Sequence, residues 1–320
     1  MKDPLPMSHE VGALRRPNLF IIGAMKSGTT FFAQLLGSHP QIFICSPKEP
    51  YYFGNPDRLR SLWPYAWHPK PWPSEHAYLQ LFKDAGEATF VGEASTTYSS
   101  LPLIQDVAPR IHQFAPDARI LYIMRDPIER TISHYWHMVN YHNEHRKPLA
   151  AIRDDPYYMS VSHYARQLAP YLNLFGAERV HTLTFEQLVA RPAETIKSVY
   201  AWLGVDAAFI PPDIENPVHV TPDKLAQTRG WVIRLARTAA WRAIRTYWPE
   251  TLRERVARLV TRPVYPGNIS MDKVIRFLRP IQTAQTEELQ ALLSRAFPEW
   301  TSLIGGFDAS PEYQRLDATA

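Results

Sequence analysis

A glycine-rich stretch near the N-terminus, Gly23-Ala-Met-Lys-Ser-Gly-Thr-Thr30, combines residue types that proteins use to hold phosphate groups. It follows an apolar run and precedes a helical pattern, so it occupies a turn between a strand and a helix. Glycines let the backbone approach an anion closely, and the unpaired N–H groups at a helix start point toward it. The lysine adds a positive charge, and the threonine hydroxyls can donate hydrogen bonds. The stretch predicts an anion-binding loop made by Lys26, Ser27, Gly28, Thr29 and Thr30.

The position of the lysine argues against the usual ATP chemistry. The loops of kinases and ATPases read G-x-x-x-x-G-K-[ST], with the lysine directly after the second glycine. Here Lys26 stands two residues before Gly28. Such enzymes also need a strand that ends in an aspartate for Mg²⁺, but the candidate strand ends with Arg125 before Asp126. A nucleotide kinase or NTPase with a deviant loop is therefore the weaker alternative.

A second set of phosphate-binding residue types follows that strand. Arginine binds phosphate through two parallel hydrogen bonds, so Arg125 suits a second phosphate better than a metal. Ser133 comes eight residues later, about two turns into the next helix, and can present its hydroxyl to the same ligand. The sequence thus offers two phosphate sites and no evident metal site.

Apolar runs alternate with helical patterns in the first two thirds of the chain, which is typical of βαβ units and a parallel sheet. We expect strands over 18–23, 89–95, 118–127 and 179–188. Helices are expected over 28–38, from Pro127 onward, and over 191–204, closed by Gly204. Both phosphate sites then directly follow a strand.

Other segments do not fit this pattern. Residues 51–82 are rich in proline and aromatic residues and predict an ordered surface excursion, whose aromatic side chains either line a cleft or pack the loop down. Residues 229–262 predict helices with interleaved arginines and tryptophans. These helices form either a layer with a solvated arginine face, which we favour, or a surface for a membrane or partner. A last helix is expected over 286–300.

The chain is long enough for one large domain or for two average ones. The chain has 320 residues, of which 45% are hydrophobic and 21% charged, as in ordinary soluble globular proteins. We expect a flexible lead-in over 1–16 and a single domain over 17–320. Within this domain, a core over 17–210 precedes a helical part over 211–320.

The net charge bears on the class of partner, and the N-terminal sequence bears on the compartment. The net charge of +4 suits a small anion and does not indicate nucleic acid. The N-terminus has no apolar signal region, and no run is long and apolar enough to span a membrane. Cys45 is the only cysteine, which excludes an internal disulfide. We expect a cytoplasmic protein without a transmembrane segment.

The two phosphate-binding segments together resemble those of sulfotransferases that use 3′-phosphoadenosine 5′-phosphosulfate (PAPS). GAMKSGTT (23–30) is similar to the 5′-phosphosulfate loop of that family. RDPIERTISHYWHM (125–138) is similar to its 3′-phosphate segment, with Arg125 and Ser133 at the matching positions.

Further segments extend the resemblance over about residues 17–205. LLGSHPQIFICSPKEPYYF (35–53) resembles the branch that acts on carbohydrate and amine acceptors. VGEASTTY (91–98) and LTFEQLVARPAETIKSVYAWLGV (183–205) match recurrent family patterns. The resemblance implies an α/β, P-loop-like three-layer fold, with a mostly parallel sheet between helices and a helical C-terminal region.

The resemblance also implies a metal-independent transfer of a sulfuryl group from PAPS. Lys26 would stabilise the charge that develops on the bridging oxygen, and Arg125 and Ser133 would hold the 3′-phosphate that distinguishes PAPS from ATP. A general base must take the acceptor proton. Glu49 stands where the resembling branch carries its catalytic glutamate; otherwise it is a surface glutamate paired with Lys48.

The chain departs from family patterns near both carboxylates. Some relatives place histidine and an acid just after the catalytic glutamate, where this chain has Tyr51 and Gly54. Glu93 is a second carboxylate candidate, which either orients the loop or the acceptor or caps a strand end. Relatives often have lysine after this glutamate, whereas Ala94 follows here.

Three further positions are weaker candidates. His39 and His134 belong to family patterns but suit structural roles better than that of a base. Arg229-Gly230 is the nearest match to a basic loop that often covers the nucleotide in this family, and its surroundings match poorly.

The expected function is sulfuryl transfer to a hydroxyl or amine of a glycan, a glycolipid or another small metabolite. The aromatic residues of the excursion could stack on sugar faces or receive an apolar chain: Trp63, Tyr65, Trp67 and Trp72. A non-catalytic nucleotide-binding or membrane-associated module, with peripheral membrane contact through 229–262, is the other alternative.

Overall fold

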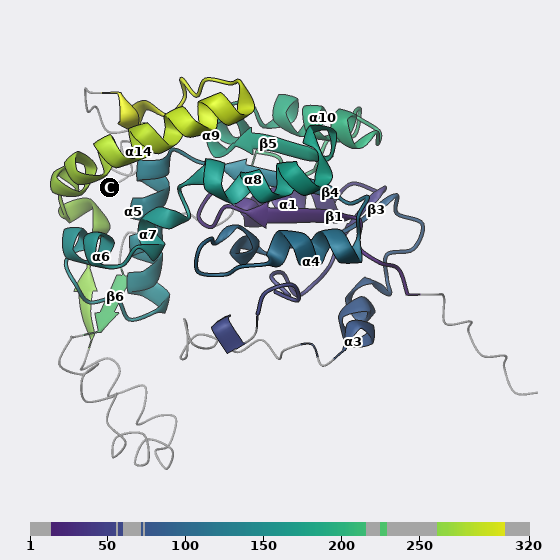
Figure 1. The fold of residues 1–320 in the computed structure, drawn as a ribbon, viewed down its shortest axis with the longest axis horizontal. Coiled ribbons are helices and arrows are strands. Elements are labelled where there is room, and N and C mark those ends of the chain that lie inside the picture. The colour runs from purple at the N-terminus through teal and green to yellow at the C-terminus, as the bar shows by residue number, and fades with distance from the viewer. Residues whose placement is uncertain are drawn as a thin grey trace, which may run out of the picture.

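The chain folds around a five-stranded parallel sheet. The computed structural model describes residues 14–55, 57–59, 72, 74–215, 225–228 and 261–304. The strands are β1 (Leu19–Gly23), β2 (Ile42–Ile44), β3 (Phe90–Ala94), β4 (Arg119–Met124) and β5 (Val180–Thr184). Their order is β2-β3-β1-β4-β5, and every pairing is parallel (Figure 1). β1 therefore lies in the middle of the sheet, beside β4.

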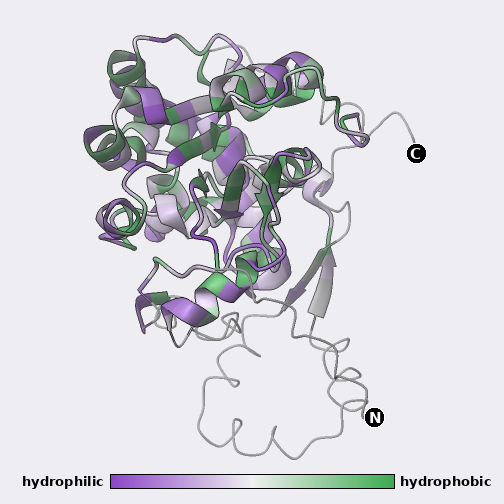
Figure 2. Cartoon of the chain, turned by 90° about the vertical axis from the view of Figure 1, so that its right-hand side faces the viewer, coloured by the Kyte–Doolittle hydropathy of each residue, from purple (hydrophilic) through white to green (hydrophobic). Residues whose placement is uncertain are grey.

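Helices cover both faces of this sheet. Every residue of β1 is buried, which explains its unbroken apolar run, LFIIG. Alternate residues of β1 belong to two separate apolar clusters. One cluster includes residues of α4 (Val107–Phe114) and α8 (Tyr164–Phe175), and the other includes residues of α1 (Thr29–Gly37) and α10 (Pro192–Leu203). The central strands are mostly green, hydrophobic, in Figure 2. The predicted three-layer α/β fold is confirmed.

The strand order brings the two predicted phosphate-binding segments together. From β1 the chain passes through α1 to β2 on one side, returns at β3, and then crosses to β4 on the other side of β1. The connections that leave β1 and β4 diverge, and such a switch point is where open α/β sheets bind ligands. The Gly23–Thr30 loop follows β1, and Arg125 follows β4 just before α5 (Pro127–Tyr141).

The predicted strands over 18–23, 89–95 and 118–127 and the helices over 28–38 and 191–204 are present, with ends shifted by a few residues. The predicted strand over 179–188 is too long. β5 ends at Thr184 because Thr184 and Gln187 form a capping box that starts α9 (Phe185–Ala190).

The segment 51–82 is only partly a surface excursion. α3 (Glu75–Leu79) is followed by a 3₁₀ turn over Gln80–Phe82, and the side chains of Phe53, Tyr78 and Phe82 are buried in the cluster that contains α4 and α8. The indole N–H of Trp72 donates to the carbonyl of Pro50 at 2.9 Å. These aromatic side chains pack the segment down. The other aromatic residues that the sequence singled out lie outside the described residues: Trp63, Tyr65 and Trp67.

The C-terminal part of the chain contains, besides its predicted helical structure, a pair of strands that the sequence did not indicate. β6 (Leu225–Thr228) and β7 (Thr261–Val264) form an antiparallel pair, and β6 contacts α5. Their sequences, LAQT and TRPV, lack the apolar alternation that would reveal a strand. Residues 229–260, with the Arg229-Gly230 candidate, lie outside the described residues.

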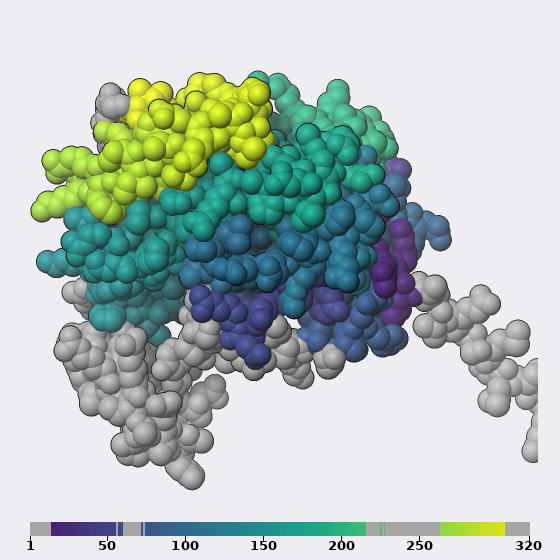
Figure 3. Space-filling view, viewed as in Figure 1, coloured from purple at the N-terminus to yellow at the C-terminus, as the bar shows by residue number. Residues whose placement is uncertain are grey.

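The last helix also differs from its prediction. α14 spans Asp272–Leu293, not 286–300, and it packs against α5, α6 (Pro148–Asp154) and α8. Gln282 and Thr286 lie on its buried face and weaken the apolar periodicity of the sequence. Phe297 and Trp300 follow the end of α14 and are buried. These apolar residues therefore anchor the chain after the helix and do not extend the helix. This segment covers the upper side of the molecule in Figure 3. No helix in the described part of the chain has both the length and the apolar character of a membrane span.

Candidate active site

The loop between β1 and α1 has the geometry of an anion cradle. Gly28 is the N-cap of α1 and has a φ of 80°, and no acidic residue stands in the first turn of that helix. The N–H groups of the first turn therefore keep their positive field for an external anion. A Cβ at Gly28 would lie 2.6 Å from the ring of Phe185, so only glycine fits this turn. The backbone N–H of Ala24 donates to Ile123 of β4 at 2.6 Å, which fixes the loop against the neighbouring strand.

A buried hydroxyl in this loop lacks a partner. The side chain of Ser27 is fully buried, and its Oγ has no hydrogen-bond partner among the described residues. Unpartnered buried polar atoms cost free energy, so such an atom in a functional loop indicates a ligand or an ordered water. Thr29 and Thr30 begin α1 beside it.

Lys26 lies in a strongly positive environment. Burial, together with the nearby charges of Arg125 and Arg130, lowers the pKa of Lys26 from 10.5 to about 8. The residue has a φ of 69°, which the fold imposes on a side chain that rarely adopts it. In the described part of the chain no carboxylate pairs with the Lys26 ammonium. An anion bound here would relieve the mutual repulsion of the three cations.

Arg125 lies two residues before the first residue of α5, and Ser133 lies within this helix. The Arg125 guanidinium lies 3.5 Å from Glu129 Oε2 and packs over the ring of Phe185 at 4.9 Å. Because Phe185 also faces Gly28, the two predicted phosphate-binding segments meet across this ring. Ser133 is half-buried in α5.

Asp126 caps α5. Its Oδ1 accepts hydrogen bonds from the N–H groups of Ile128 at 3.0 Å and Glu129 at 3.2 Å, and its Oδ2 accepts one from the N–H of Ser302 at 3.1 Å. The Ser302 hydroxyl also donates to this carboxylate. Asp126 is therefore the N-cap residue of α5, and these hydrogen bonds hold its carboxylate in place. In the described residues no group of three or more His, Cys, Asp or Glu side chains could hold a metal ion.

The C-terminal segment reinforces this helix start through Glu186. One Glu186 oxygen accepts the backbone N–H of Asp126 at 2.8 Å, and the other accepts the indole N–H of Trp300 at 3.2 Å. Burial raises the pKa of Glu186 to about 7, although the hydrogen bond from the Asp126 N–H and the charge of Arg125 act in the opposite direction. Sequence reasoning missed Glu186 and Trp300, because neither position carries a signal until the C-terminal segment is folded back.

Arg130 is a second residue that sequence reasoning missed. Its side chain is fully buried in α5 and donates to the Ser162 hydroxyl at 2.5 Å, to the Met25 carbonyl at 3.4 Å and to the Tyr158 carbonyl. No carboxylate pairs with it in the described part of the chain. Burying a cation that has only neutral partners costs free energy. Through its contact with Met25, the residue before Lys26, Arg130 also adds positive potential next to the loop.

Glu49 is held on the neighbouring loop. Its Oε1 lies 3.1 Å from Lys48 Nζ, and its Oε2 accepts hydrogen bonds from the Thr96 hydroxyl at 2.9 Å and the Thr96 N–H at 3.3 Å. The Tyr51 hydroxyl also hydrogen-bonds to Glu49, and burial together with this carboxylate raises the pKa of Tyr51. The pair with Lys48 thus forms, but the glutamate is part of a network rather than a free surface group.

Tyr157 connects Glu49 to the Lys26 loop. Its hydroxyl lies 3.6 Å from the sulfur of Met25, and the charge of Glu49 contributes to raising its pKa, after the larger effect of burial. The glutamate and the lysine loop therefore face a common region that contains Tyr157.

Glu93 is closed off from this region. The carboxylate is fully buried and accepts hydrogen bonds from the hydroxyls of Tyr78 at 2.6 Å, Tyr98 at 2.9 Å and Ser95 at 2.9 Å. Burial raises its pKa to about 7. Because the Ser95 hydroxyl also accepts the N–H of Tyr51 at 3.2 Å, Glu93 supports the loop that carries Glu49.

The histidines divide into structural and site-adjacent residues. His39 bridges the carbonyl of Asp206 and the N–H of Gln41, both at 3.0 Å. His134 is fully buried, and burial and Arg130 hold its pKa well below the usual range. Burial and the charge of Lys26 lower the pKa of His137 to about 3, so this residue, which the sequence did not single out, lies near Lys26 as a neutral imidazole.

Comparison with known proteins identifies the family. The chain matches the model described as "Sulfotransferase family" over residues 17–209. It is 31% identical to the membrane-associated sulfotransferase kil1 of Dictyostelium discoideum over 132 residues, which are 41% of this chain and 25% of that protein. It is 25% identical to heparan sulfate glucosamine 3-O-sulfotransferase 3B1 of Mus musculus over 216 residues, which are 63% of this chain and 50% of that protein. The chain thus spans half the length of these relatives or less.

A solved structure supports the same assignment over almost the whole fold. The sulfotransferase from Alicyclobacillus acidocaldarius is 26% identical, with a TM-score of 0.62, and the match covers 89% of this chain and 99% of that one. The family match alone covers more than half of the chain. The protein therefore belongs to the sulfotransferase family, and the resemblance to PAPS-dependent sulfotransferases that its motifs indicated is confirmed.

Proposed function

We propose that the protein transfers a sulfuryl group from PAPS to a hydroxyl or amine of an acceptor. The observation that carries this proposal is the concentration of positive charge at the switch point of the sheet. Burial lowers the pKa of Lys26 most, and Arg125 and the buried Arg130 lie close enough to lower it further. A donor with two phosphate-bearing ends matches this concentration of charge.

Each of the predicted donor-binding residues has a distinct task in this proposal. The N–H groups of Gly28, Thr29 and Thr30 and the free hydroxyl of Ser27 bind the 5′-phosphosulfate. Lys26 stabilises the charge on the bridging oxygen as the sulfur–oxygen bond to the phosphate breaks. Arg125 and Ser133 bind the 3′-phosphate of the donor.

Glu49 is the proposed general base. As the acceptor oxygen or nitrogen forms its bond to sulfur, the Glu49 carboxylate takes the acceptor proton. Its hydrogen bonds to Thr96 and Tyr51 fix the carboxylate in one orientation, which general-base catalysis needs. Tyr51 replaces the histidine of some relatives in this support.

The class of acceptor is proposed from the names of the relatives. The matched heparan sulfate sulfotransferase acts on a glycan by its name, and we infer a glycan, a glycolipid or another small metabolite with a free hydroxyl or amine as the acceptor. The predicted cytoplasmic location and the absence of a metal remain predictions. The kinase alternative loses support because Asp126 caps a helix and is also bound by Ser302.

The decisive experiment combines donor binding with turnover. Incubation with ³⁵S-labelled PAPS and a panel of glycan, lipid and amine acceptors should label at least one acceptor without added metal. Adenosine 3′,5′-bisphosphate (PAP) should raise the melting temperature, because it binds the folded state. Stabilisation by ATP with Mg²⁺ but not by PAP, together with no transfer, would refute the proposal.

Substitution of Glu49 tests the general base separately from donor binding. Glu49→Gln should bind PAP as the natural chain does and lose about 100-fold or more in kcat, as general-base removal does. Lys48→Gln serves as a control for the neighbouring ion pair, since it removes the partner of Glu49 without removing the base. Full turnover by Glu49→Gln would place the base elsewhere, while the donor assignment would stand.

A further inference from the structure

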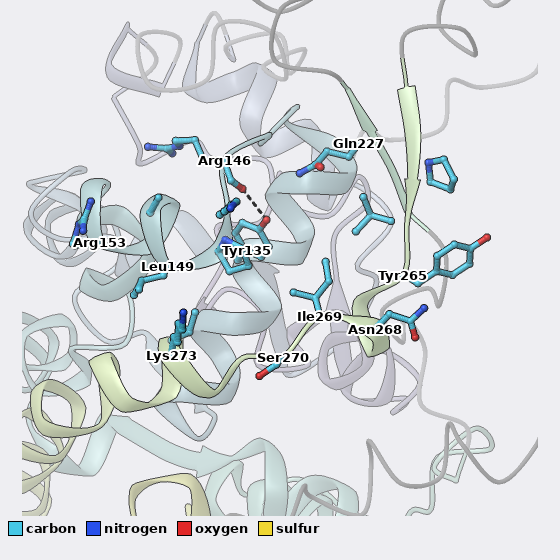
Figure 4. Close-up of a pocket in the computed structure, with 16 residues that line it drawn as sticks. Tyr135, Arg146, Leu149, Arg153, Gln227, Tyr265, Asn268, Ile269, Ser270 and Lys273 are labelled. Carbon is cyan, nitrogen blue, oxygen red and sulfur yellow. Dashed lines mark hydrogen bonds between the residues drawn. The ribbon is translucent and has the colours of Figure 1, made fainter.

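A separate cavity lies beside α5. Its volume is about 730 Å³, and it is lined by residues of α5, α6, β6, β7 and the first turn of α14, and by the loops between them (Figure 4). Tyr135 of α5 lines this cavity. Because Tyr135 comes two positions after Ser133, the two side chains leave the helix about 200° apart. The cavity is therefore on the opposite side of α5 from the proposed 3′-phosphate site.

Most of the cavity lining is apolar. The aliphatic side chains come from Leu149 of α6, Val264 of β7, Val274 of α14 and Ile269 in the loop before α14. Val264 and Val274 are buried, and they belong to the same apolar cluster as Tyr135. Cavities of roughly 300–1,000 Å³ with apolar walls and a few polar groups are the usual sites for small ligands. The size and lining fit a molecule with an alkyl or aryl body.

The charged side chains that line the cavity are all cationic: Arg146, Lys147, Arg153 and Lys273. Two of them are compensated, since Arg146 pairs with Glu144 and Arg153 pairs with Asp154 at 2.8 Å. Lys147 and Lys273 are exposed, and no carboxylate pairs with either of them in the described part of the chain. Figure 4 shows Lys273 and Arg153 on the helical side of the cavity, opposite Tyr265.

We propose that this cavity binds an anionic amphiphile, a small molecule with a phosphate or carboxylate head and an alkyl chain. The chain would lie on the apolar lining, and Lys147 and Lys273 would hold the head at the rim. An inorganic anion would leave the apolar lining in water, and an uncharged chain would gain nothing from the two lysines. This site does not depend on the proposed sulfuryl transfer, and its ligand does not compete with PAPS.

Calorimetric titration of the full chain with octyl phosphate, octanol and inorganic phosphate tests both halves of this ligand. Octyl phosphate should bind, and the other two should bind at least about tenfold more weakly, because each lacks one of the two recognised parts. The binding should weaken as salt is raised, since the lysines are exposed. Saturation of the protein with PAP should leave the dissociation constant for octyl phosphate unchanged.

Two variants locate the site. Lys147→Glu with Lys273→Glu should weaken octyl phosphate binding about tenfold, because two attractions become repulsions. The matched control reverses two exposed lysines elsewhere, Lys83→Glu with Lys197→Glu, and should leave binding unchanged. Ala150→Trp should block the cavity in a chain whose circular dichroism is unaltered.

Several results would overturn the assignment. It fails if octanol binds as tightly as octyl phosphate, if both charge-reversal pairs have the same effect, or if Ala150→Trp binds normally. Lack of any octyl phosphate binding has the same consequence. Displacement by PAP would assign the ligand to the nucleotide site instead. A chain that binds octyl phosphate but not PAP would contradict the proposed function alone.

Discussion

In the proposed donor site, the lowered pKa of Lys26 should make the affinity for PAP depend on pH. With a pKa of about 8, the ammonium of the free protein is about nine tenths charged at pH 7 and about one tenth charged at pH 9. A bound phosphate next to Lys26 raises its pKa again, so the complex stays protonated over this range. The affinity for PAP should therefore be nearly constant below pH 7.5 and about tenfold lower at pH 9, which is about 1.4 kcal/mol.

Calorimetric titration with PAP between pH 7 and 9.5 measures this change, because phosphate groups have a pKa near 6 and are ionised throughout. Lys26→Arg is the matched control, since arginine keeps its charge at every pH in this range. Its affinity should vary little with pH, and Glu186, which has a pKa of about 7, affects both chains alike. A constant affinity of the natural chain up to pH 9, or the same decrease in Lys26→Arg, would refute the assignment of Lys26 to the phosphosulfate.

Other perturbations test the loop, the buried carboxylate and the 3′-phosphate contact. Gly28→Ala should lower the free energy of unfolding in urea by about 2 kcal/mol and abolish PAP binding, because the φ of Gly28 is 80° and the added Cβ would overlap Phe185. Gly86→Ala is the control, since Gly86 has a φ of 50° and no atom lies within 4 Å of the added Cβ. This variant should lower the free energy of unfolding by only about 1 kcal/mol. Burial raises the pKa of Glu93 from 4.5 to about 7, so its contribution to stability is fully present below pH 4.5 and is lost as the pH rises through 7, by about 3 kcal/mol. Urea unfolding of Glu93→Gln across this range should show a flatter dependence on pH, and an unchanged slope would contradict the role of burial. Ser133→Ala should weaken PAP binding about tenfold and leave AMP binding unchanged, because AMP lacks the 3′-phosphate; equal losses for both nucleotides would remove Ser133 from that site.

The parts of the fold that sequence reasoning predicted are those whose signal is local. β1 and β4 are buried on both faces, and each appears as an unbroken apolar run. The glycine turn after β1 must take a positive φ at Gly28, which the residue type itself shows. β6 and β7 carry no such signal, since LAQT and TRPV become strands only by pairing with each other across a long insertion.

The candidate site divides in the same way. The residue types of the Lys26 loop and of Arg125 indicate anion binding on their own, and the sheet order brings the two segments to neighbouring strands. Arg130 gives no such indication, because an arginine in a helix is usually solvated and only tertiary packing buries it. Glu186, Trp300 and Ser302 give no local signal either, because their contacts form only when the C-terminal segment packs against the start of α5.

The distribution of counter-charges distinguishes the two ends of the proposed donor site. Arg125 has Glu129 at 3.5 Å and Glu186 close by, so its positive charge is partly balanced before any ligand arrives. Lys26 faces Arg125 and the buried Arg130, and no carboxylate pairs with it in the described part of the chain. The electrostatic stabilisation that an anion gains is therefore largest at Lys26. In the proposed reaction this is also where negative charge develops as the sulfuryl group departs, so the fixed cations favour the transition state more than the bound donor.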